Sequence, residues 1–317
     1  MVIGIFVVED KKVRYNIYVT KEKIKGEQSV SMGIPEYEIN SFSDFNEQIS
    51  NAYKEGYTFY RGDKVKDNNE ENLLFTSFDK KKDGKFIFEG KDCDNLINDF
   101  MSIALSKMSY IPTNYFEKML TAQHYGIPTR LQDWSESPLV ALFFATSNSK
   151  ELKEDDYCVM WCLNPLKLNA KTKRIVSDLT NNTYIPNISL DASREIALGY
   201  IDSFYGLEPK AEHGLFPIAI RTYKINPRIE AQKGVFLIYP RERKSLIEFE
   251  DVDQYLIKLI IKKSVAEELE NLLAIYKINN YQLFPEISSI ALDVKKGRRL
   301  QNATSRINTA FFVAKLK

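Results

Sequence analysis

The sequence predicts an α+β fold, in which a mixed β-sheet that could be split packs against helices and an N-terminal β-hairpin is added to it. Strand-like apolar runs and helix-like apolar repeats follow one another irregularly along the 317 residues. No internal repeat, proline-rich linker or strong composition break divides the chain. We therefore expect one unit, with an N-terminal β-rich segment at 1–45, a core at 46–165 and a C-terminal continuation at 166–317.

The first sixty residues predict a hairpin, a helix and a strand. Two strand-like runs, Val2 to Val8 and Val13 to Val19, flank a charged turn. A helix with a cap near Ser43 is expected to end before Gly56. The strand from Tyr57 to Tyr60 would then place Arg61 and Gly62 at its end, where glycine permits close backbone approach.

Three helices are predicted in the middle of the core. Apolar residues recur with helical spacing from Asn95 to Met108. A second helix starts near Pro112-Thr113, with Thr113 as its cap, and Gly126 ends it. Ser137-Pro138 opens a third helix with a cap residue followed by proline, and Leu139 to Ala145 is apolar all round, as expected for a buried helix.

The second half predicts further strands and two helices. A capping box at Ser264-Val-Ala-Glu267 indicates the start of a helix, and Pro285 that of the last one. Four apolar runs are typical of strands, and the first of them is apolar on both faces. They are Tyr157 to Leu163, Leu215 to Thr222, Gly234 to Tyr239, and Tyr255 to Ile261.

Composition restricts the class of protein. Lys and Arg number 44 against 43 Asp and Glu, so no global positive field exists, and nucleic-acid binding, although not excluded, would need a local patch. Lys80 to Lys82 and Arg241 to Lys244 could form such patches, but they are more typical of solvated loops. Three cysteines without metal-binding spacing fit a reducing, cytoplasmic setting, and no apolar span is long enough for a membrane.

Several enzyme classes lack their signature residues. The chain has no phosphate-binding Gly-x-x-x-x-Gly-Lys-Ser/Thr loop, no Gly-x-Gly-x-x-Gly turn, no Gly-x-Ser-x-Gly elbow and no His-Glu-x-x-His helix. The sequence contains two histidines, His124 and His213, and they do not show the spacing of metal ligands. We therefore predict no metal centre.

Two residues are candidates for ligand binding from their local context. Arg61 follows three aromatic residues, so its guanidinium needs an anionic partner, which could be an internal carboxylate or a ligand phosphate or carboxylate. His124 lies in a predicted last helical turn, where a protonated imidazole would face the negative helix end. Alternatively, Gln123, His124 and Tyr125 project into the crevice that holds Arg61.

Two further clusters offer polar side chains. Arg130 and Asp133 could pair to brace the loop around Thr129, with Trp134 as a core anchor, and such a rigid loop could also hold a site. Glu230 and Gln232 precede an apolar strand and would share one face if that strand extends back to them.

These motifs together resemble those of a known family. Phe59-Tyr60-Arg61-Gly62 and the block His124-Tyr-Gly-Ile-Pro-Thr-Arg-Leu-Gln-Asp-Trp134 are similar to the signature of the FRG domain family, an aromatic-Arg-Gly tripeptide followed by His-Tyr-Gly-x-Pro-Thr-Arg-Leu-x-Asp-Trp. Ala231-Gln-Lys-Gly-Val-Phe236 and Leu283-Phe284-Pro285 also look like downstream elements of that family. The resemblance extends from about Tyr57 to about Ala291.

The resemblance implies two alternative functions. The motif order looks like that of ADP-ribosyltransferases, which would make NAD the substrate, with Arg61 and either Glu230 or Gln232 carrying catalysis. Ligand contacts would then come from the rest of the site: Tyr60, Gly62, His124, Tyr125, Thr129, Arg130, Asp133 and Trp134. A glutamine cannot supply the negative charge of a catalytic glutamate. The alternative is therefore a noncatalytic module that senses a nucleotide or phosphorylated small molecule and reports it to a protein partner. In either case the resemblance implies a role in bacterial defence against phages or mobile elements.

Overall fold

The computed structural model describes residues 2–10, 13–20, 30–31, 33–90, 92–171, 184–188, 216–222, 226–295 and 297. The strands of the described residues are β1 (Val2–Asp10), β2 (Val13–Thr20), β3 (Val30–Ser31), β4 (Glu36–Ile39), β5 (Phe59–Val65), β6 (Lys81–Lys82), β7 (Lys85–Phe86), β8 (Leu131–Ser135), β9 (Tyr157–Leu163), β10 (Ile218–Ile220), β11 (Gly234–Ile238) and β12 (Leu256–Lys262).

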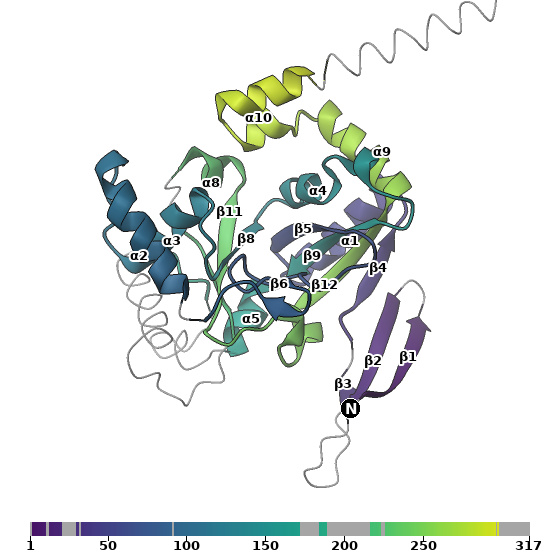
Figure 1. The fold of residues 1–317 in the computed structure, drawn as a ribbon. Helices are drawn as coiled ribbons and strands as arrows, with labels where there is room; N and C mark the ends of the chain where they lie inside the picture. The colour runs from purple at the N-terminus through teal and green to yellow at the C-terminus, as the bar shows by residue number, and fades with distance from the viewer. Residues whose placement is uncertain are drawn as a thin grey trace, which may run out of the picture.

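Ten of these described strands form one mixed sheet, which confirms the predicted α+β class (Figure 1). Its order is β1-β2-β4-β12-β9-β5-β8-β11-β10, with β3 beside β2. The pairing of β12 with β4 is parallel, and the other pairings in this sheet are antiparallel. Strands from 1–45, 46–165 and 166–317 therefore interleave in a single sheet.

Several strand predictions are confirmed. The β1–β2 pair is the predicted N-terminal hairpin, with Asp10 opposite Val13 at its turn. Strand β9 covers the predicted residues and lies in the middle of the sheet. Its side chains alternate between two hydrophobic clusters, with Met160 in one and Trp161 in the other. Both faces of β9 are thus buried, as its continuous apolar run predicted.

The predicted end of β5 is wrong. The strand continues past Arg61 and Gly62 to Val65, because residues 59–65 pair without interruption with residues 157–163 of β9. Arg61 and Gly62 therefore lie in the middle of a strand. A strand can continue through a glycine when tertiary packing requires a position without a side chain.

The helices of the described residues are α1 (Phe42–Lys54), α2 (Asp92–Ala104), α3 (Tyr115–His124), α4 (Pro138–Thr146), α5 (Pro165–Lys171), α8 (Pro227–Ala231), α9 (Lys263–Ile275) and α10 (Asn280–Leu283), and residues 287–295 are also helical. Short 3-10 helices lie at η1 (Leu105–Lys107), η2 (Ser149–Glu151), η3 (Leu246–Glu248) and η4 (Val252–Gln254).

The helix caps agree only partly with the sequence predictions. Ser137 caps α4 as predicted, and its hydroxyl accepts a hydrogen bond from the amide of Val140. Helix α1 is capped by Ser41, not Ser43, and α3 by Asn114, not Thr113. The predicted capping box at Ser264 is wrong, because α9 already begins at Lys263 and has no side-chain cap.

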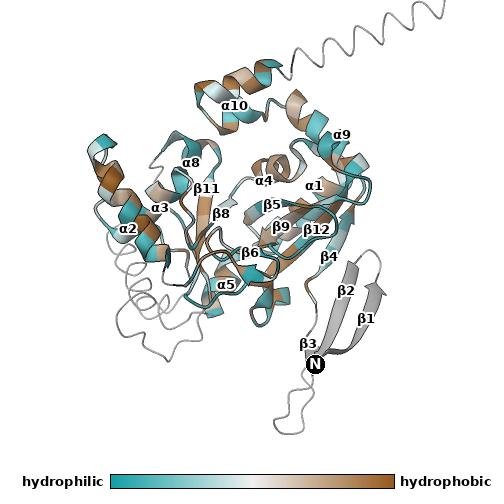
Figure 2. Cartoon of the chain, viewed as in Figure 1, coloured by the Kyte–Doolittle hydropathy of each residue, from teal (hydrophilic) through white to brown (hydrophobic). Residues whose placement is uncertain are grey.

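Helix α4 packs directly against β5 through Gly62. A methyl group on Gly62 would lie 2.0 Å from the carbonyl oxygen of Ala141 and 2.5 Å from the amide nitrogen of Ala145. The predicted close approach at this glycine is therefore real, and the approaching group is a helix backbone. Helix α4 is largely apolar (Figure 2), and its buried side chains belong to a hydrophobic cluster that also includes residues of β5 and α9.

Candidate functional site

The candidate site lies where two neighbouring strands of the sheet, β5 and β8, separate. These neighbouring strands pair at one position, Tyr60 with Ser135, before they diverge. If the ladder continued, the next residues, Arg61 and Trp134, would face each other. A pocket of about 350 Å³ opens at this divergence. Clefts of a few hundred Å³ lined by apolar walls and a few polar groups are the usual form of small-molecule sites.

Residues in or beside six helices and strands, together with Phe284, line this pocket. Its polar residues are Arg61 of β5, Gln123 and His124 of α3, Asp133 and Ser135 of β8, and Asn226, Arg228 and Gln232 in or beside α8. Its apolar walls are Tyr60, Leu120, Trp134, Val140, Ala141, Phe144, Ile229, Phe236 and Phe284, and Gly62 and Gly234 complete the lining. The pocket therefore combines cationic, acidic and aromatic groups.

Arg61 bridges the gap between the diverging strands. Its Nε and Nη2 donate to the two carboxylate oxygens of Asp63 at 3.1 and 3.2 Å, and its Nη1 donates to the main-chain oxygen of Asp133 at 2.7 Å. Burial opposes the charge of Arg61, but Asp63 and Asp133 more than compensate, so its pKa is raised. Three of the five N–H groups of the guanidinium donate to these oxygens. The guanidinium also lines the pocket.

Asp133 presents its carboxylate to the same pocket. Its Oδ1 accepts a 2.8 Å hydrogen bond from Nε2 of Gln123. Solvent reaches the group through the pocket, but the surrounding walls remove part of its hydration. This burial raises the pKa of Asp133, while the nearby charge of Arg61, the Gln123 hydrogen bond and the charge of Arg228 oppose the shift.

His124 lies in the last turn of α3 as predicted and lines the pocket. Burial lowers its pKa, the charge of Arg228 lowers it further, and Glu286 opposes the shift. A lowered pKa favours the neutral imidazole at neutral pH, so the protonated helix-end role is disfavoured. The neutral ring can offer one donor and one acceptor. Tyr125, by contrast, is largely exposed and packs edge-on against His124 outside the pocket lining.

Thr129 supports the site from behind, and Trp134 anchors one wall of the pocket in the core. Thr129 is fully buried, outside the pocket lining, and its hydroxyl donates to Oε1 of Gln123. Trp134 is the predicted core anchor: it is 4% exposed and its Nε1 donates to Oε1 of Gln132 at 2.8 Å. That oxygen also accepts from the hydroxyl of Tyr239, so the indole donor has the partner that its burial requires.

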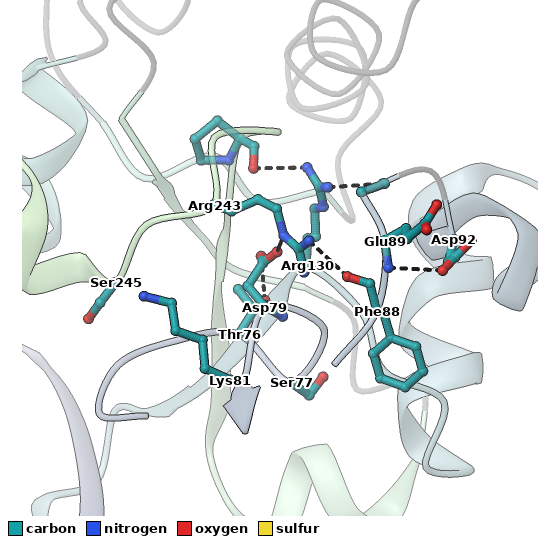
Figure 3. Close-up of polar contacts among 12 residues, drawn as sticks. Thr76, Ser77, Asp79, Lys81, Phe88, Glu89, Asp92, Arg130, Arg243 and Ser245 are labelled. Carbon is teal, nitrogen blue, oxygen red and sulfur yellow. Dashed lines mark hydrogen bonds and ion pairs between the residues drawn. The ribbon is translucent and has the colours of Figure 1, made fainter. Parts of the chain in front are cut away.

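Arg130 lies away from the pocket, and its predicted role as a ligand contact is not supported by its position. Its Nη1 and Nη2 donate to the main-chain oxygens of Pro240 and Gly90. Figure 3 shows it in a separate buried cluster with Arg243 and Asp79. Arg130 therefore braces the loop through main-chain carbonyl groups and not through Asp133. The Asp133 carboxylate instead accepts a hydrogen bond from Gln123 and lines the pocket.

The segment before β11 folds differently from the prediction. Glu230 and Gln232 would share one face if the strand extended back to them, but residues 227–231 form helix α8 and β11 begins at Gly234. Gln232 lines the pocket, and its Nε2 donates to the main-chain oxygen of Leu283 at 3.1 Å. Glu230 is exposed and does not belong to the lining. Helical geometry separates these two side chains.

Helix α8 also brings a second arginine that the sequence analysis missed. Arg228 lines the pocket, and its guanidinium stacks over Phe284 at 4.4 Å from the ring centroid. Its buried Nε has no hydrogen-bond partner in the described part of the chain. A signal was present: Asn226-Pro227 is an N-cap followed by proline, which indicates a helix, and Arg228 and Gln232 are then four residues apart on one face.

These observations define an α+β protein with a small-molecule pocket at the divergence of two neighbouring strands in one mixed sheet. Residues 56–154 match the family model of the FRG domain, so the chain carries an FRG domain there. The match includes Arg61, His124 and Asp133, whereas Arg228 and Phe284 line the same pocket from beyond it. Comparison with curated proteins and with solved structures gave no match. No helix among the described residues combines the length and apolar character needed to cross a bilayer.

Proposed function

We propose that the pocket binds a small anionic ligand of the nucleotide class. The observation that carries this proposal is Arg228, whose buried Nε has no acceptor among the described residues although its side chain lines a cavity. A buried guanidinium donor without an acceptor is costly, and a phosphate oxygen would satisfy it. Arg61 adds, on another wall of the cavity, two N–H groups that have no acceptor among the residues that the structure describes.

Aromatic walls supply the second half of the recognition. Phe284 and Phe144 meet edge to face at 5.9 Å, and both line the pocket near the arginines. Planar bases gain favourable contact with such rings, as do the guanidinium groups that stack on them. A ligand that joins an anion to a planar ring system therefore fits the lining better than inorganic phosphate alone.

The same pocket supports a second candidate, an ADP-ribosyltransferase-like reaction on NAD. One observation favours it: Asp133 supplies a carboxylate to the pocket, where neither Glu230 nor Gln232 supplies one. In this reaction the bond between ribose C1′ and the nicotinamide nitrogen breaks, and its electron pair leaves with nicotinamide. A negative group stabilises the positive ribose before water or an acceptor attacks C1′ and loses its proton. We assign that group to Asp133 in this candidate.

The noncatalytic alternative uses the same contacts without bond cleavage. The chain would sense a nucleotide and report it to a protein partner in the cytoplasm. A role in bacterial defence against phages or mobile elements is compatible with both candidates, and both share the binding step.

The binding step is tested by calorimetric titration of the purified chain with AMP and with NAD. We expect Arg228→Met to weaken binding by roughly 10- to 100-fold, because it removes charged hydrogen bonds to the ligand. The matched control is Lys150→Met, which removes an exposed cation elsewhere and should leave affinity unchanged. Binding that is absent in the native chain, or equal in both variants, would contradict the proposal.

The two candidates are then separated by incubation with NAD. Release of nicotinamide, or transfer of label to proteins of a cell extract, supports the enzyme when Asp133→Asn abolishes it and Lys150→Met does not. Tight binding of NAD without turnover supports the sensor.

A further inference from the structure

Asp133 is unusual in this pocket because it is an acid in a site that otherwise attracts anions. Among the described residues that line the cavity it is the sole carboxylate, and it shares the cavity with Arg61 and Arg228. A ligand phosphate near these arginines would be repelled by a bare carboxylate. A ligand that also brings a hydrogen-bond donor to Asp133 would offset this repulsion and bind more tightly.

The neighbouring side chains fix Asp133 as an acceptor. The hydroxyl of Thr129 donates to Oε1 of Gln123, so the amide of Gln123 must turn its NH₂ group toward Asp133. The amide of Thr129 donates in turn to the hydroxyl of Ser77 at 3.0 Å, which anchors this chain of contacts to the loop behind the pocket. Oδ1 of Asp133 is therefore occupied by Gln123.

The second carboxylate oxygen is open to a ligand. No donor from another described residue reaches Oδ2 of Asp133, although the side chain is accessible through the pocket. An ionised carboxylate can accept about four hydrogen bonds. The site thus offers a preorganised acceptor beside two cations, and the complementary ligand has a donor close to its anion.

We infer that Asp133 is a specificity-determining residue, which accepts a hydrogen bond from a ribose hydroxyl and so selects ribonucleotides over nucleotides that lack it. This inference rests on the proposed function. A ribonucleotide joins the three required features: a phosphate for the arginines, hydroxyls for Asp133 and a planar base for Phe144 and Phe284. Sites built to pair a substrate hydroxyl reject analogues without it, because the acceptor is then covered by the bound analogue and left unpaired.

The test compares AMP with 2′,3′-dideoxy-AMP by calorimetric titration. The native chain is expected to bind AMP at least about 10-fold more tightly than the dideoxy analogue, since a hydrogen bond to a charged group is lost. The 2′-deoxy and 3′-deoxy analogues identify which hydroxyl is read, and ribose 5-phosphate shows what the base contributes.

Two variants distinguish a specific role from a general one. Asp133→Asn keeps an oxygen for Gln123 but replaces the open oxygen by a donor, so the preference for AMP should fall below about 3-fold. Arg228→Met should weaken AMP and dideoxy-AMP by the same factor and leave the preference intact. Asp155→Asn, at an exposed acid away from the pocket, serves as the matched control.

The outcomes separate this inference from the proposed function. If the native chain binds both nucleotides equally well, or if Asp133→Asn retains the full preference, the role of Asp133 is refuted while nucleotide binding stands. If the native chain binds neither AMP nor NAD, both proposals fail.

Discussion

The guanidinium of Arg61 donates a 2.7 Å hydrogen bond to the main-chain oxygen of Asp133, across the point where β5 and β8 separate. A side chain thus makes the contact that backbone pairing would make in a continuous ladder. The same guanidinium is held by both oxygens of Asp63. Arg61 is therefore both a structural tie between the two parts of the sheet and part of the pocket wall.

This double role predicts that lysine cannot replace Arg61. Lysine is a point charge without the planar fork that reaches Asp63 and the carbonyl of Asp133 together. Arg61→Lys is expected to lower the free energy of unfolding by about 1.5–3 kcal/mol, the range for hydrogen bonds that involve a charged group. Urea unfolding measures this change. Arg221→Lys, in an exposed pair with Glu136, should change it by less than about 1 kcal/mol. Equal effects in the two variants would contradict the structural role of Arg61.

Gly62 is predicted to be the least replaceable glycine near the site. In Gly62→Ala the new methyl group would overlap the backbone of α4 at Ala141 and Ala145, so the helix must move off the sheet. We expect a loss of about 3 kcal/mol or more in unfolding free energy, at the upper end of overpacking effects. Gly90→Ala is the matched control, because open space surrounds that position. A Gly62→Ala protein as stable as Gly90→Ala would show that α4 does not contact β5 closely.

The buried pair of Arg243 and Asp79 gives a prediction about stability alone. Nε of Arg243 donates to Oδ1 of Asp79 at 2.8 Å, and the Asp79 side chain is 1% exposed. Arg243→Met leaves that carboxylate buried without its cation, which typically costs about 3–5 kcal/mol. The exposed pair of Lys244 and Glu242 supplies the control Lys244→Met, with an expected change below about 1 kcal/mol. Chemical unfolding of the Arg243→Met and Lys244→Met variants measures both changes. An unchanged nucleotide affinity of folded Arg243→Met would show that this cluster does not contribute to binding in the pocket.

The raised pKa of Asp133 predicts a pH-dependent gain in stability for Asp133→Asn. Because the pKa in the folded state lies above the ordinary value of 3.8, ionisation of Asp133 is harder in the folded chain than in the unfolded one. Its contribution to stability is therefore full below about pH 4 and is lost as the pH rises through the raised pKa. Asp133→Asn should gain stability relative to the native chain over that same rise. Unfolding measured across this pH range would refute the prediction if the difference between the two proteins stayed constant.

Much of the local structure could be predicted from the sequence. The hairpin at the N-terminus, the strand over β9, the cap at Ser137 and the end of α3 before Gly126 all follow from short-range patterns of apolar spacing and capping. Trp134 was predicted as a possible core anchor whose single donor needs a partner, and it is buried with its Nε1 hydrogen-bonded to Gln132. The motif around Arg61 and the block from His124 to Trp134 also indicated one shared site, and Arg61 lines the pocket together with His124, Asp133 and Trp134 of that block.

The tertiary structure decided which residues complete that site. Strand β12 inserts between β4 and β9, and α8 and Phe284 approach β5 from more than 150 residues away in the sequence. Such contacts depend on which surfaces bury the most apolar area together, and spacing within one segment does not encode this. For the same reason Gly62 could be recognised as a point of close approach, but only packing revealed that α4 is the partner. Local periodicity thus determined the elements, and long-range burial decided that Arg228, not Glu230, faces Asp133 across the pocket.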